Sequence, residues 1–274
     1  MKNPYASRVL IAQISDLHIQ ARGALSYGVV DTAQYLRACA AHIRGLRQRP
    51  DVVVATGDLT DGGKPEEYAL LRELLAELQL PLYLIPGNHD ERATLRAAFA
   101  DHDYLRQNEE FICYAIEDWP VRIVALDTTV PGAGGGLLCE KRLGWLAATL
   151  RARQEAPTVV LMHHPPFRTL IGHMDDMGLA NPDSFKSVLA NHPQVKAVLC
   201  GHLHRPIETA WRGILMSTSP GPAHQIDLDL APGAPGRFIM EPPAIRLHAW
   251  SADDGWLSHT SYIGEFAGPY PFRE

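Results

Sequence analysis

Short apolar runs alternate with segments of helical periodicity through the first hundred residues of the chain. Apolar runs bounded by polar residues predict buried strands, and apolar residues spaced three or four apart predict amphipathic helices. The predicted strands are 8–15, 52–56 and 82–85, and the predicted helices are 32–47, 65–78 and 91–99. Strands that alternate with helices indicate a parallel sheet joined by right-handed crossovers.

The pattern is less regular after residue 100. Residues 111–117 and 121–127 predict an antiparallel strand pair, and a glycine-rich loop follows at 132–136. Later segments predict helices near 142–151 and 182–190, a strand at 158–162 and a strand that ends at Cys200. Beyond Pro206 the pattern predicts strand pairs, including 245–250 and 256–262 around an Asp-Asp-Gly turn. We find no internal repeat and no domain boundary.

Composition narrows the class of protein. The net charge is −6, from 31 acidic and 25 basic residues, which argues against a broad basic face for long nucleic acid. The four cysteines form no C-x-x-C pair, so we expect reduced thiols rather than a zinc knuckle or a redox motif. No apolar stretch approaches the ~20 residues of a membrane span, and the N-terminus lacks a signal-peptide core. We therefore expect a cytoplasmic protein with no membrane partner.

Polar residues with metal-binding or catalytic chemistry follow each strong strand. In open α/β sheets, ligands bind beyond the carboxyl ends of the strands, so five strand ends are expected to meet at one crevice. The side chains concerned are Asp16, His18, Asp58, Asn88, His89, Asp90, His163, His164, His202 and His204.

Taken as metal ligands, a subset of these residues supplies two carboxylates, an amide oxygen and three or four imidazoles. That mixture of oxygen and nitrogen donors suits Fe, Mn, Zn or Co rather than Ca or a thiolate-bound metal. Seven ligands are too many for one four-coordinate ion. They suit two ions about 3.5 to 4 Å apart that share a bridging carboxylate, the arrangement used for in-line displacement at phosphorus.

Each motif alone has an ordinary structural explanation. Asp16-x-His18 reads as a cap beside a solvated histidine, and Gly-Asn-His-Asp reads as a turn in which Asp90 caps the next helix. If the strand that ends at Cys200 continued, the alternation of side chains would point His202 and His204 to the same side. The two rings could then bind one ion together, one ion each, or no ion. The motifs occur in order, each at a strand end, and this coincidence favours a metal site.

The ordered set resembles the calcineurin-like metallophosphoesterases, and within them the small bacterial phosphodiesterases of the cyclic-nucleotide and glycerophosphodiester type. The motifs that carry the resemblance are D-x-H, G-D, G-N-H-D, H-H and G-H-x-H, with R-G-A-L-S-Y-G-V-V-D, G-K-P-E-E-Y, L-I-P-G-N-H-D and S-T-S-P-G-P-A-H-Q in support. The main motifs span roughly the first 204 residues.

This resemblance implies a four-layer αββα sandwich, an α/β fold of two mixed sheets flanked by helices. It implies a single domain over residues 1–274, in which 206–274 completes the second sheet and offers apolar edges to a dimer partner. It assigns the ligands residue by residue. Asp16, His18 and His204 would hold one metal, Asn88, His163 and His202 the other, and Asp58 would bridge them. His202 and His204 would thus serve one metal each.

The same resemblance implies a hydrolase of small phosphodiesters, whose nucleophile is a hydroxide held between the two ions. His89 follows the ligand Asn88 but is assigned to no metal, so we expect it to contact the phosphate or protonate the leaving oxygen. Asp90 would orient the His89 ring or cap the helix, with capping favoured. His164 should lie in the core or behind the ligands.

Other residues are candidates for contacting the substrate. Arg22 and Tyr27 lie in the loop after the first ligand pair, and His224 lies in the Pro-Gly-Pro-Ala-His-Gln segment. Residues 167–178, which include His173, lie between two ligand-bearing strands and could cover the substrate. The alternative for each is an ordinary surface position.

Three other functions fit the same motifs less well. A phosphomonoesterase or a lipid-headgroup hydrolase would use the same metal site, and a non-catalytic scaffold would keep only the fold. Every ligand position is present, which disfavours the scaffold. The sequence does not separate cyclic nucleotides from glycerophosphodiesters, because loops determine the shape of the pocket.

Overall fold

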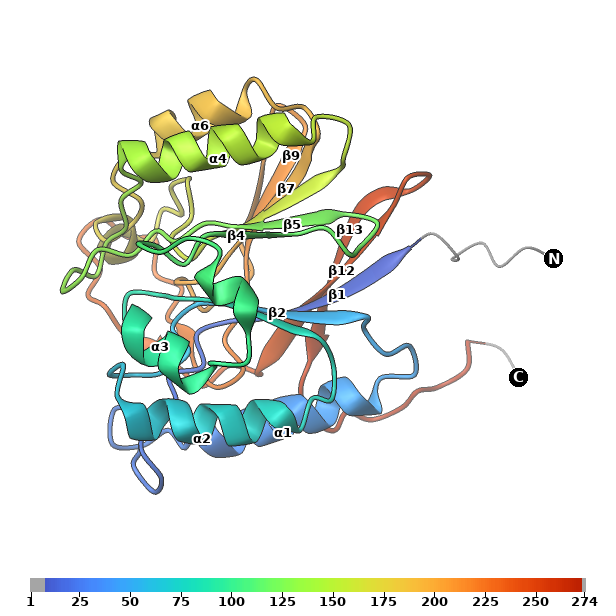
Figure 1. Cartoon of the computed structure of the whole chain (residues 1–274). Coiled ribbons are helices and arrows are strands. Elements are labelled where there is room, and N and C mark those ends of the chain that lie inside the picture. The colour runs from blue at the N-terminus through green and yellow to red at the C-terminus, as the bar shows by residue number, and fades with distance from the viewer. Residues whose placement is uncertain (1–7, 273–274) are drawn as a thin grey trace.

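Two mixed β-sheets face each other in the computed structural model, which describes residues 8–272. Helices α4 and α6 cover the outer face of one sheet, and α1 and α2 lie under the other, as the four layers of Figure 1 show. The predicted four-layer α/β sandwich is therefore confirmed. The helices are α1 (Thr32–Gly45), α2 (Pro65–Ala76), α3 (Arg92–Ala98), α4 (Glu140–Ala152), α5 (Gly172–Asp175) and α6 (Pro182–Leu189).

The first sheet has the order β13-β12-β1-β2-β3. The central strands β1 and β2 are parallel, with Ala12 opposite Val53, and β12 is antiparallel to β1. All residues of β1 and β2 are buried, as expected for strands covered on both faces. The strands are β1 (Val9–Ile14), β2 (Val52–Thr56), β3 (Leu82–Ile85), β12 (Ala244–Ser251) and β13 (Gly255–Tyr262).

The second sheet has the order β4-β5-β6-β7-β9-β8. Strands β5, β6, β7 and β9 are parallel, and the antiparallel pair predicted between 111 and 127 is β4 with β5. The strands are β4 (Tyr114–Ile116), β5 (Arg122–Ala125), β6 (Thr158–Leu161), β7 (Val195–Cys200), β8 (Glu208–Trp211) and β9 (Ile214–Thr218). A short separate hairpin pairs β10 (Gln225–Ile226) with β11 (Phe238–Ile239).

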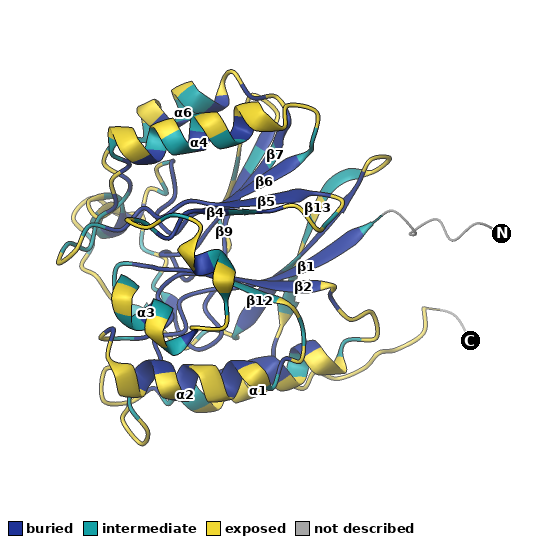
Figure 2. Cartoon of the chain, in the orientation of Figure 1, coloured by how far each residue is buried: buried dark blue, intermediate teal, exposed yellow. Residues whose placement is uncertain are grey.

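Strand alternation divides the apolar residues between two cores. Val159 and Leu161 of β6 belong to the core between the sheets, whereas Val160 belongs to the core under α4 and α6. Successive side chains of a strand point to opposite faces, so one strand supplies both cores. Figure 2 shows the result: the central strands such as β1, β2, β5, β6 and β7 are almost entirely buried, whereas the helices alternate buried and exposed positions.

The C-terminal segment differs from expectation. Residues 206–274 were expected to complete the second sheet, but only β8 and β9 join it, whereas β12 and β13 extend the first sheet. The reason is that β12 pairs antiparallel with β1, with Val9 opposite Trp250, and so covers an edge that the N-terminal strands alone would leave open.

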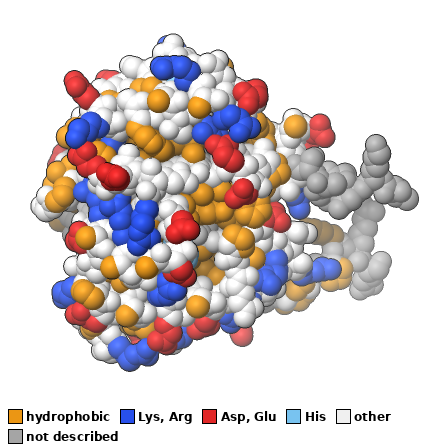
Figure 3. Space-filling view, in the orientation of Figure 1, with side chains coloured by type: hydrophobic (Ala, Val, Ile, Leu, Met, Phe, Trp, Pro, Cys, Tyr) orange, Lys and Arg blue, Asp and Glu red, His pale blue; other side chains and the backbone are white. Residues whose placement is uncertain are grey.

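Two further features concern the surface and the helices. On the face shown in Figure 3, basic and acidic side chains are intermixed and form no continuous basic field. Among residues 8–272, no helix has the length and apolar character that crossing a bilayer requires.

Candidate metal centre

Loops that follow β1, β2, β3, β6 and β7 bring the candidate ligands to one end of the two sheets. Backbone hydrogen bonds continue beyond the strands and fix these loops to one another. The amides of Asp16 and His18 donate to the carbonyls of Gly57 and Asp58, at 3.0 Å each. Gly201 N donates to His163 O, also at 3.0 Å, and a Cβ on Gly201 would overlap the Ser15 hydroxyl. The predicted convergence of strand ends is therefore present, and glycine is required at position 201.

The ligand loops have an unusual backbone. The φ angles of Asp16, His18, Asp58, His202 and His204 are all positive, between 44° and 71°. This left-handed conformation is uncommon for residues other than glycine, and it occurs where surrounding structure enforces it, often at functional sites. It also corrects the strand assumption made for His202 and His204. Strand β7 ends at Cys200, and turns rather than strand alternation aim both rings.

Asp16, His18 and His204 form the first ligand group. The Nε2 atoms of His18 and His204 lie 3.2 Å apart, and Nε2 of His204 lies 3.7 Å from Asp16 Oδ1. Asp16 Oδ2 is buried and has no hydrogen-bond partner. A buried carboxylate oxygen without a partner is costly, and two imidazole nitrogens that face each other require a shared cation or proton. Both observations fit a metal ion.

Asn88, His163 and His202 form the second ligand group. Asn88 Oδ1 lies 3.1 Å from His163 Nε2. The rings of His163 and His202 are 5.1 Å apart between centroids, and both side chains are buried. This group mixes an amide oxygen with two imidazoles and contains no carboxylate of its own.

Asp58 lies between the two groups. Its Oδ2 atom is 3.6 Å from Nε2 of His18 and 3.4 Å from Nε2 of His163. Its Oδ1 atom accepts a hydrogen bond from the amide of His89 at 2.9 Å, which fixes the orientation of the carboxylate. This is the position that a carboxylate bridging two ions requires.

Hydrogen bonds to the outer nitrogen of each histidine set which nitrogen can act as a ligand. Nδ1 of His163 donates to Thr56 O at 2.8 Å, and Nδ1 of His204 donates to His224 O at 3.2 Å, which leaves Nε2 free in both. His202 is reversed, because its Nε2 donates to Met177 O at 3.1 Å and leaves Nδ1 free. Such outer contacts orient metal-binding histidines and fix their tautomers.

Asp61 is a residue that the sequence analysis missed. Its carboxylate lies 3.2 Å from His18 Nδ1, and its carbonyl accepts a hydrogen bond from His89 Nδ1 at 2.7 Å. Asp61 therefore orients one candidate ligand and one candidate catalytic side chain. The available signal was the Gly-Asp-Leu-Thr-Asp stretch, which places a second carboxylate three residues after Asp58.

The electrostatics of the cluster favour positive charge at its centre. Burial raises the pKa of the Asp16 carboxyl to about 6. Burial alone would lower the pKa of His163, but the neighbouring Asp58 carboxylate raises it to about 9. His163 in turn holds the pKa of Asp58 well below its usual range, against the effect of burial. A cation placed in this field would be stabilised by the same carboxylates.

His89 and Asp90 follow the ligand Asn88 and differ from each other. The His89 side chain is 36% exposed, and its ring meets the His18 ring edge to face at 4.6 Å. Asp90 points inward and accepts hydrogen bonds from the amides of Gly87, Leu59 and Thr60 and from the hydroxyls of Thr60 and Tyr68.

The expectation that Asp90 caps the following helix is wrong. Glu91 occupies the N-cap position of α3, with its carboxylate accepting from the amides of Ala93 and Thr94. Asp90 is unavailable for this role because Tyr68 and three amides hold it in the interior. Asp90 thus connects the loop after β3 to the loop after β2, and it makes no described contact with the His89 ring.

His164 is buried beside the second group but offers no free nitrogen. Its Nε2 donates to Gly134 O at 3.0 Å, and its Nδ1 accepts from the Thr128 hydroxyl at 2.8 Å. Burial lowers the pKa of His164 to about 3, so the ring is neutral. The expected place behind the ligands agrees with these contacts.

Two of the predicted substrate contacts lie at the rim of the centre. The Tyr27 ring meets the His224 ring at 5.3 Å and stacks on Phe238 of β11 at 4.8 Å. His224 is buried, its ring lies 4.6 Å from that of His204, and neither of its nitrogens has a hydrogen-bond partner. These side chains form a wall beside the first ligand group.

Arg22 lies elsewhere. Its guanidinium is 2.6 Å from Glu73 on α2, and both side chains are mostly exposed. In the segment 167–178, Met177 contacts the centre through its carbonyl, as described above, and Gly236 of the β10–β11 hairpin packs against His173.

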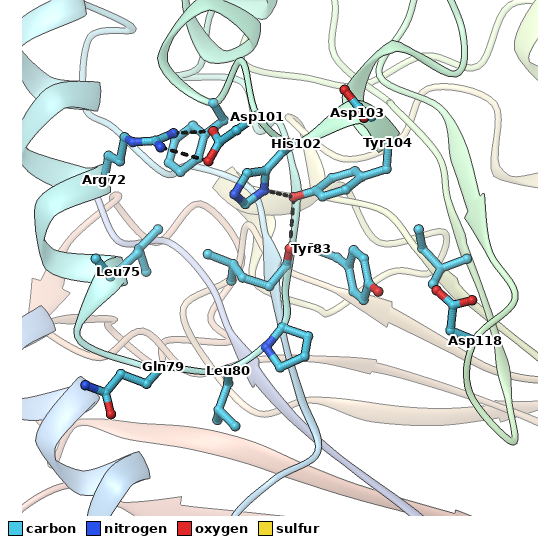
Figure 4. A pocket seen from close by; sticks show the side chains of 15 residues that line it. Arg72, Leu75, Gln79, Leu80, Tyr83, Asp101, His102, Asp103, Tyr104 and Asp118 are labelled. Carbon is cyan, nitrogen blue, oxygen red and sulfur yellow. Dashed lines mark hydrogen bonds and ion pairs between the residues drawn. The ribbon is translucent and has the colours of Figure 1, made fainter.

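A cavity of about 610 Å³ lies outside the metal centre, at the edge strand β3. Figure 4 shows that Tyr104 points across this cavity, where its hydroxyl contacts His102 and the carbonyl of Leu82. The same hydroxyl accepts from Leu84 N at 3.1 Å. Tyr104 therefore occupies the hydrogen-bonding edge that another strand would use, and none of the candidate ligands lines this cavity.

Comparison with known proteins shows the family to which the chain is similar. Residues 9–206 match the family model described as calcineurin-like phosphoesterase. A protein of Arcobacter nitrofigilis named probable glycerophosphodiester phosphodiesterase GpdQ is 41% identical, over 96% of this chain and 97% of its own length. The 3',5'-cyclic adenosine monophosphate phosphodiesterase CpdA of Pseudomonas aeruginosa is 32% identical, over 91% of this chain and 88% of its own length.

A solved structure supports the fold. The dimetal phosphatase of Danio rerio superposes with a TM-score of 0.64 over 93% of this chain and 99% of that protein, at 17% identity. Together with the matched residues and the ligand geometry, these similarities identify the chain as a member of the calcineurin-like phosphoesterase family.

Proposed function

We propose that the chain is a phosphodiesterase that hydrolyses small phosphodiesters, glycerophosphodiesters or 3',5'-cyclic nucleotides, with two metal ions. The observation that carries this proposal is the position of Asp58, whose Oδ2 atom lies within 3.6 Å of His18 Nε2 and 3.4 Å of His163 Nε2. The names of the relatives support a diester as substrate, and the 41% identical relative makes a glycerophosphodiester the first substrate to test.

The ligand chemistry fits two transition-metal ions drawn from Fe, Mn, Zn and Co. Asp16, His18 and His204 would hold one ion, Asn88, His163 and His202 the other, and Asp58 would contact both. Ions bound there would lower the pKa of a coordinated water toward about 7 and withdraw charge from the phosphate.

His89 would protonate the leaving group. Asp61 O accepts from Nδ1, so a proton added at Nε2 makes the ring cationic and able to protonate a leaving oxygen. The Asp61 carboxylate, 4.0 Å from Nδ1, would stabilise that cation. The side chain is 36% exposed, so a substrate at the mouth of the centre could reach the ring.

Tyr27 and His224 would contact the alcohol or base of the diester. They form the wall next to the first ligand group, in which Tyr27 is exposed and the His224 ring is buried against it. The Arg22 guanidinium is paired with Glu73, so it gives this wall no positive charge. A neutral alcohol suits such a wall better than a second phosphate.

Reconstitution tests the proposal. Metal-free protein would be loaded with Mn, Co, Zn or Fe and assayed against glycerophosphoethanolamine, cyclic AMP, a bis-aryl phosphate and a mono-aryl phosphate. We expect activity only after loading and a preference for the diesters. Dominant hydrolysis of the mono-aryl phosphate would favour a monoesterase, and no hydrolysis of any substrate by fully loaded protein would favour a non-catalytic member.

A further inference from the structure

A second set of buried contacts lies behind the metal centre, around Asp127 in the loop that follows β5. Asp127 is fully buried and accepts two hydrogen bonds from Arg92, from Nε at 2.6 Å and from a terminal nitrogen at 3.0 Å. It also accepts from the amides of Ile112 and Thr129 at 3.1 and 2.9 Å. The carboxylate is thus fixed from several directions.

Arg142 of α4 completes this cluster. Its guanidinium donates to the carbonyls of Asp127 and Thr129, at 3.0 Å each. The ring of Phe111 lies 4.5 Å from the Arg142 guanidinium and 5.5 Å from that of Arg92. The Asp127 carboxylate and the Arg142 guanidinium are therefore buried, and the Arg92 side chain is 17% exposed. Such ion pairs often add little net stability, because desolvation offsets their attraction, so a role in positioning is a reasonable alternative.

The contacts reach both sides of the second ligand group. Arg92 is the first residue of α3 and follows the ligand Asn88 by four positions. Thr128, next to Asp127, bonds the His164 ring at 2.8 Å and accepts from the His164 amide at 3.4 Å. His164 adjoins the ligand His163. Asp127 and Thr128 thus contact two loops: the loop of Asn88, which follows a strand of the first sheet, and the loop of His163, which follows a strand of the second.

The glycine-rich loop 132–136 also contacts the His164 ring. Gly134 O accepts from His164 Nε2, and a Cβ on Gly136 would collide with the His164 ring. Close approach of this loop therefore requires glycine at position 136. The first ligand group has no described contact with Asp127. Its residues Asp16 and His18 are held instead by backbone hydrogen bonds to the loop after β2.

We propose that Arg92, Asp127, Thr128 and His164 form a positioning brace that sets the separation of Asn88 and His163, and with it the affinity of the second ion. The inference rests on the metal centre proposed above. The brace makes no described contact with the first ligand group, so it acts on one ion and not on the other.

Thr128 offers the sharpest test. Thr128→Val keeps the shape and removes the hydroxyl, and Thr128→Ser restores it. Thr158→Val is a matched control, because Thr158 is also fully buried but lies at the far end of β6, where its hydroxyl contacts only Ala156 O among the described residues. Melting temperatures of the variants would be compared before metal binding is measured.

Mn²⁺ and Co²⁺ affinities would be measured by calorimetry in two single-site backgrounds. His204→Ala leaves the second ligand group intact, and Asn88→Ala leaves the first. We expect Thr128→Val to weaken binding roughly 10-fold in the His204→Ala background and to change it less than about two-fold in the Asn88→Ala background. Thr128→Ser should restore the affinity, and Thr158→Val should leave both affinities unchanged.

The outcomes separate the brace from the proposed metal centre. Equal weakening in both backgrounds, or no weakening with His204→Ala, would overturn the brace while leaving the centre in place. Fewer than two ions per wild-type chain would overturn the centre itself. If Thr128→Val does not fold, Arg92→Lys provides the same test, because it keeps the charge beside Asp127 and loses the paired contacts with Asp127 and Thr129.

Discussion

The two ligand groups of the metal centre are built differently. The first, Asp16 with His18 and His204, has its own carboxylate in addition to Asp58, and a second carboxylate, Asp61, supports His18 from outside. The second, Asn88 with His163 and His202, has only the shared Asp58, and backbone carbonyls support its imidazoles. Charge therefore favours tighter binding of a dication by the first group.

On the proposed assignment, this difference would give the two ions distinct duties. The first group has more carboxylate charge, which would suit a resident ion. The second joins loops from both sheets, and the proposed brace at the Asp127 turn would align them. An ion held there would respond more readily to changes in loop position.

The largest effect is expected when the shared ligand is removed. Asp58→Asn removes charge from both groups, so both ions should bind more weakly and diester hydrolysis should fall at least about 10³-fold. Metal content by elemental analysis and steady-state kinetics would measure this. Asp101→Asn, which changes an exposed carboxylate paired with Arg72, is the control. Loss of only one ion would show that Asp58 does not bridge.

Removing His89 should affect chemistry more than metal binding. His89→Ala should lower kcat about 100-fold for diesters with poor leaving groups, and much less for bis-aryl phosphates, because a good leaving group needs no proton. Both ions should remain bound. Equal kcat values for wild type and variant with a poor leaving group would rule out the acid role.

Substitution of Asp61 should have a smaller effect, which is expected only in the first ligand group. Asp61→Asn removes the charge that orients His18 and should weaken the first ion about 10-fold, with little change in the second. Calorimetric titration in the Asn88→Ala background would measure the first ion, and titration in the His204→Ala background would measure the second. An effect confined to the second ion would contradict the assignment of His18.

Arg22 should give the smallest effect. Because its guanidinium is paired with Glu73 at the surface, Arg22→Ala is expected to change KM for a glycerophosphodiester less than about two-fold. A large increase in KM would mean that Arg22 leaves Glu73 and contacts the substrate, as the sequence analysis expected. Tyr27→Ala, at the rim of the centre, is the comparison variant.

Much of the fold could be predicted because its signals are local. Residues 52–56 and 82–85 are apolar runs with polar ends, and they are strands β2 and β3 within those bounds. The convergence of the candidate ligands could also be predicted, because ligand-binding loops gather beyond the carboxyl ends of strands, here strands of both sheets. The assignment of each side chain to one ion stays a prediction. The partition of residues 206–274 between two sheets could not be predicted, because pairing of β12 with β1 depends on contacts more than 200 positions apart.

Details of the centre depended on backbone conformations that residue patterns do not encode. Alternation gave a plausible direction for His202 and His204, but left-handed turns at both positions determine their actual orientation. Asp90 resembles a helix cap by position, yet Tyr68, from a distant helix, draws it inward and Glu91 takes the cap. Asp61 was missed because its role appears only when His18 and His89 are seen on either side of it.

The central claim is that two ligand groups share Asp58 and otherwise bind one ion each. Metal stoichiometry of His204→Ala and Asn88→Ala, measured by elemental analysis after dialysis against limiting free Mn²⁺, tests it most directly. Wild type should hold two ions and each variant should hold one, with the ion kept by Asn88→Ala bound more tightly than the ion kept by His204→Ala. Loss of both ions from either variant, or equal affinity of the two remaining ions, would contradict this account.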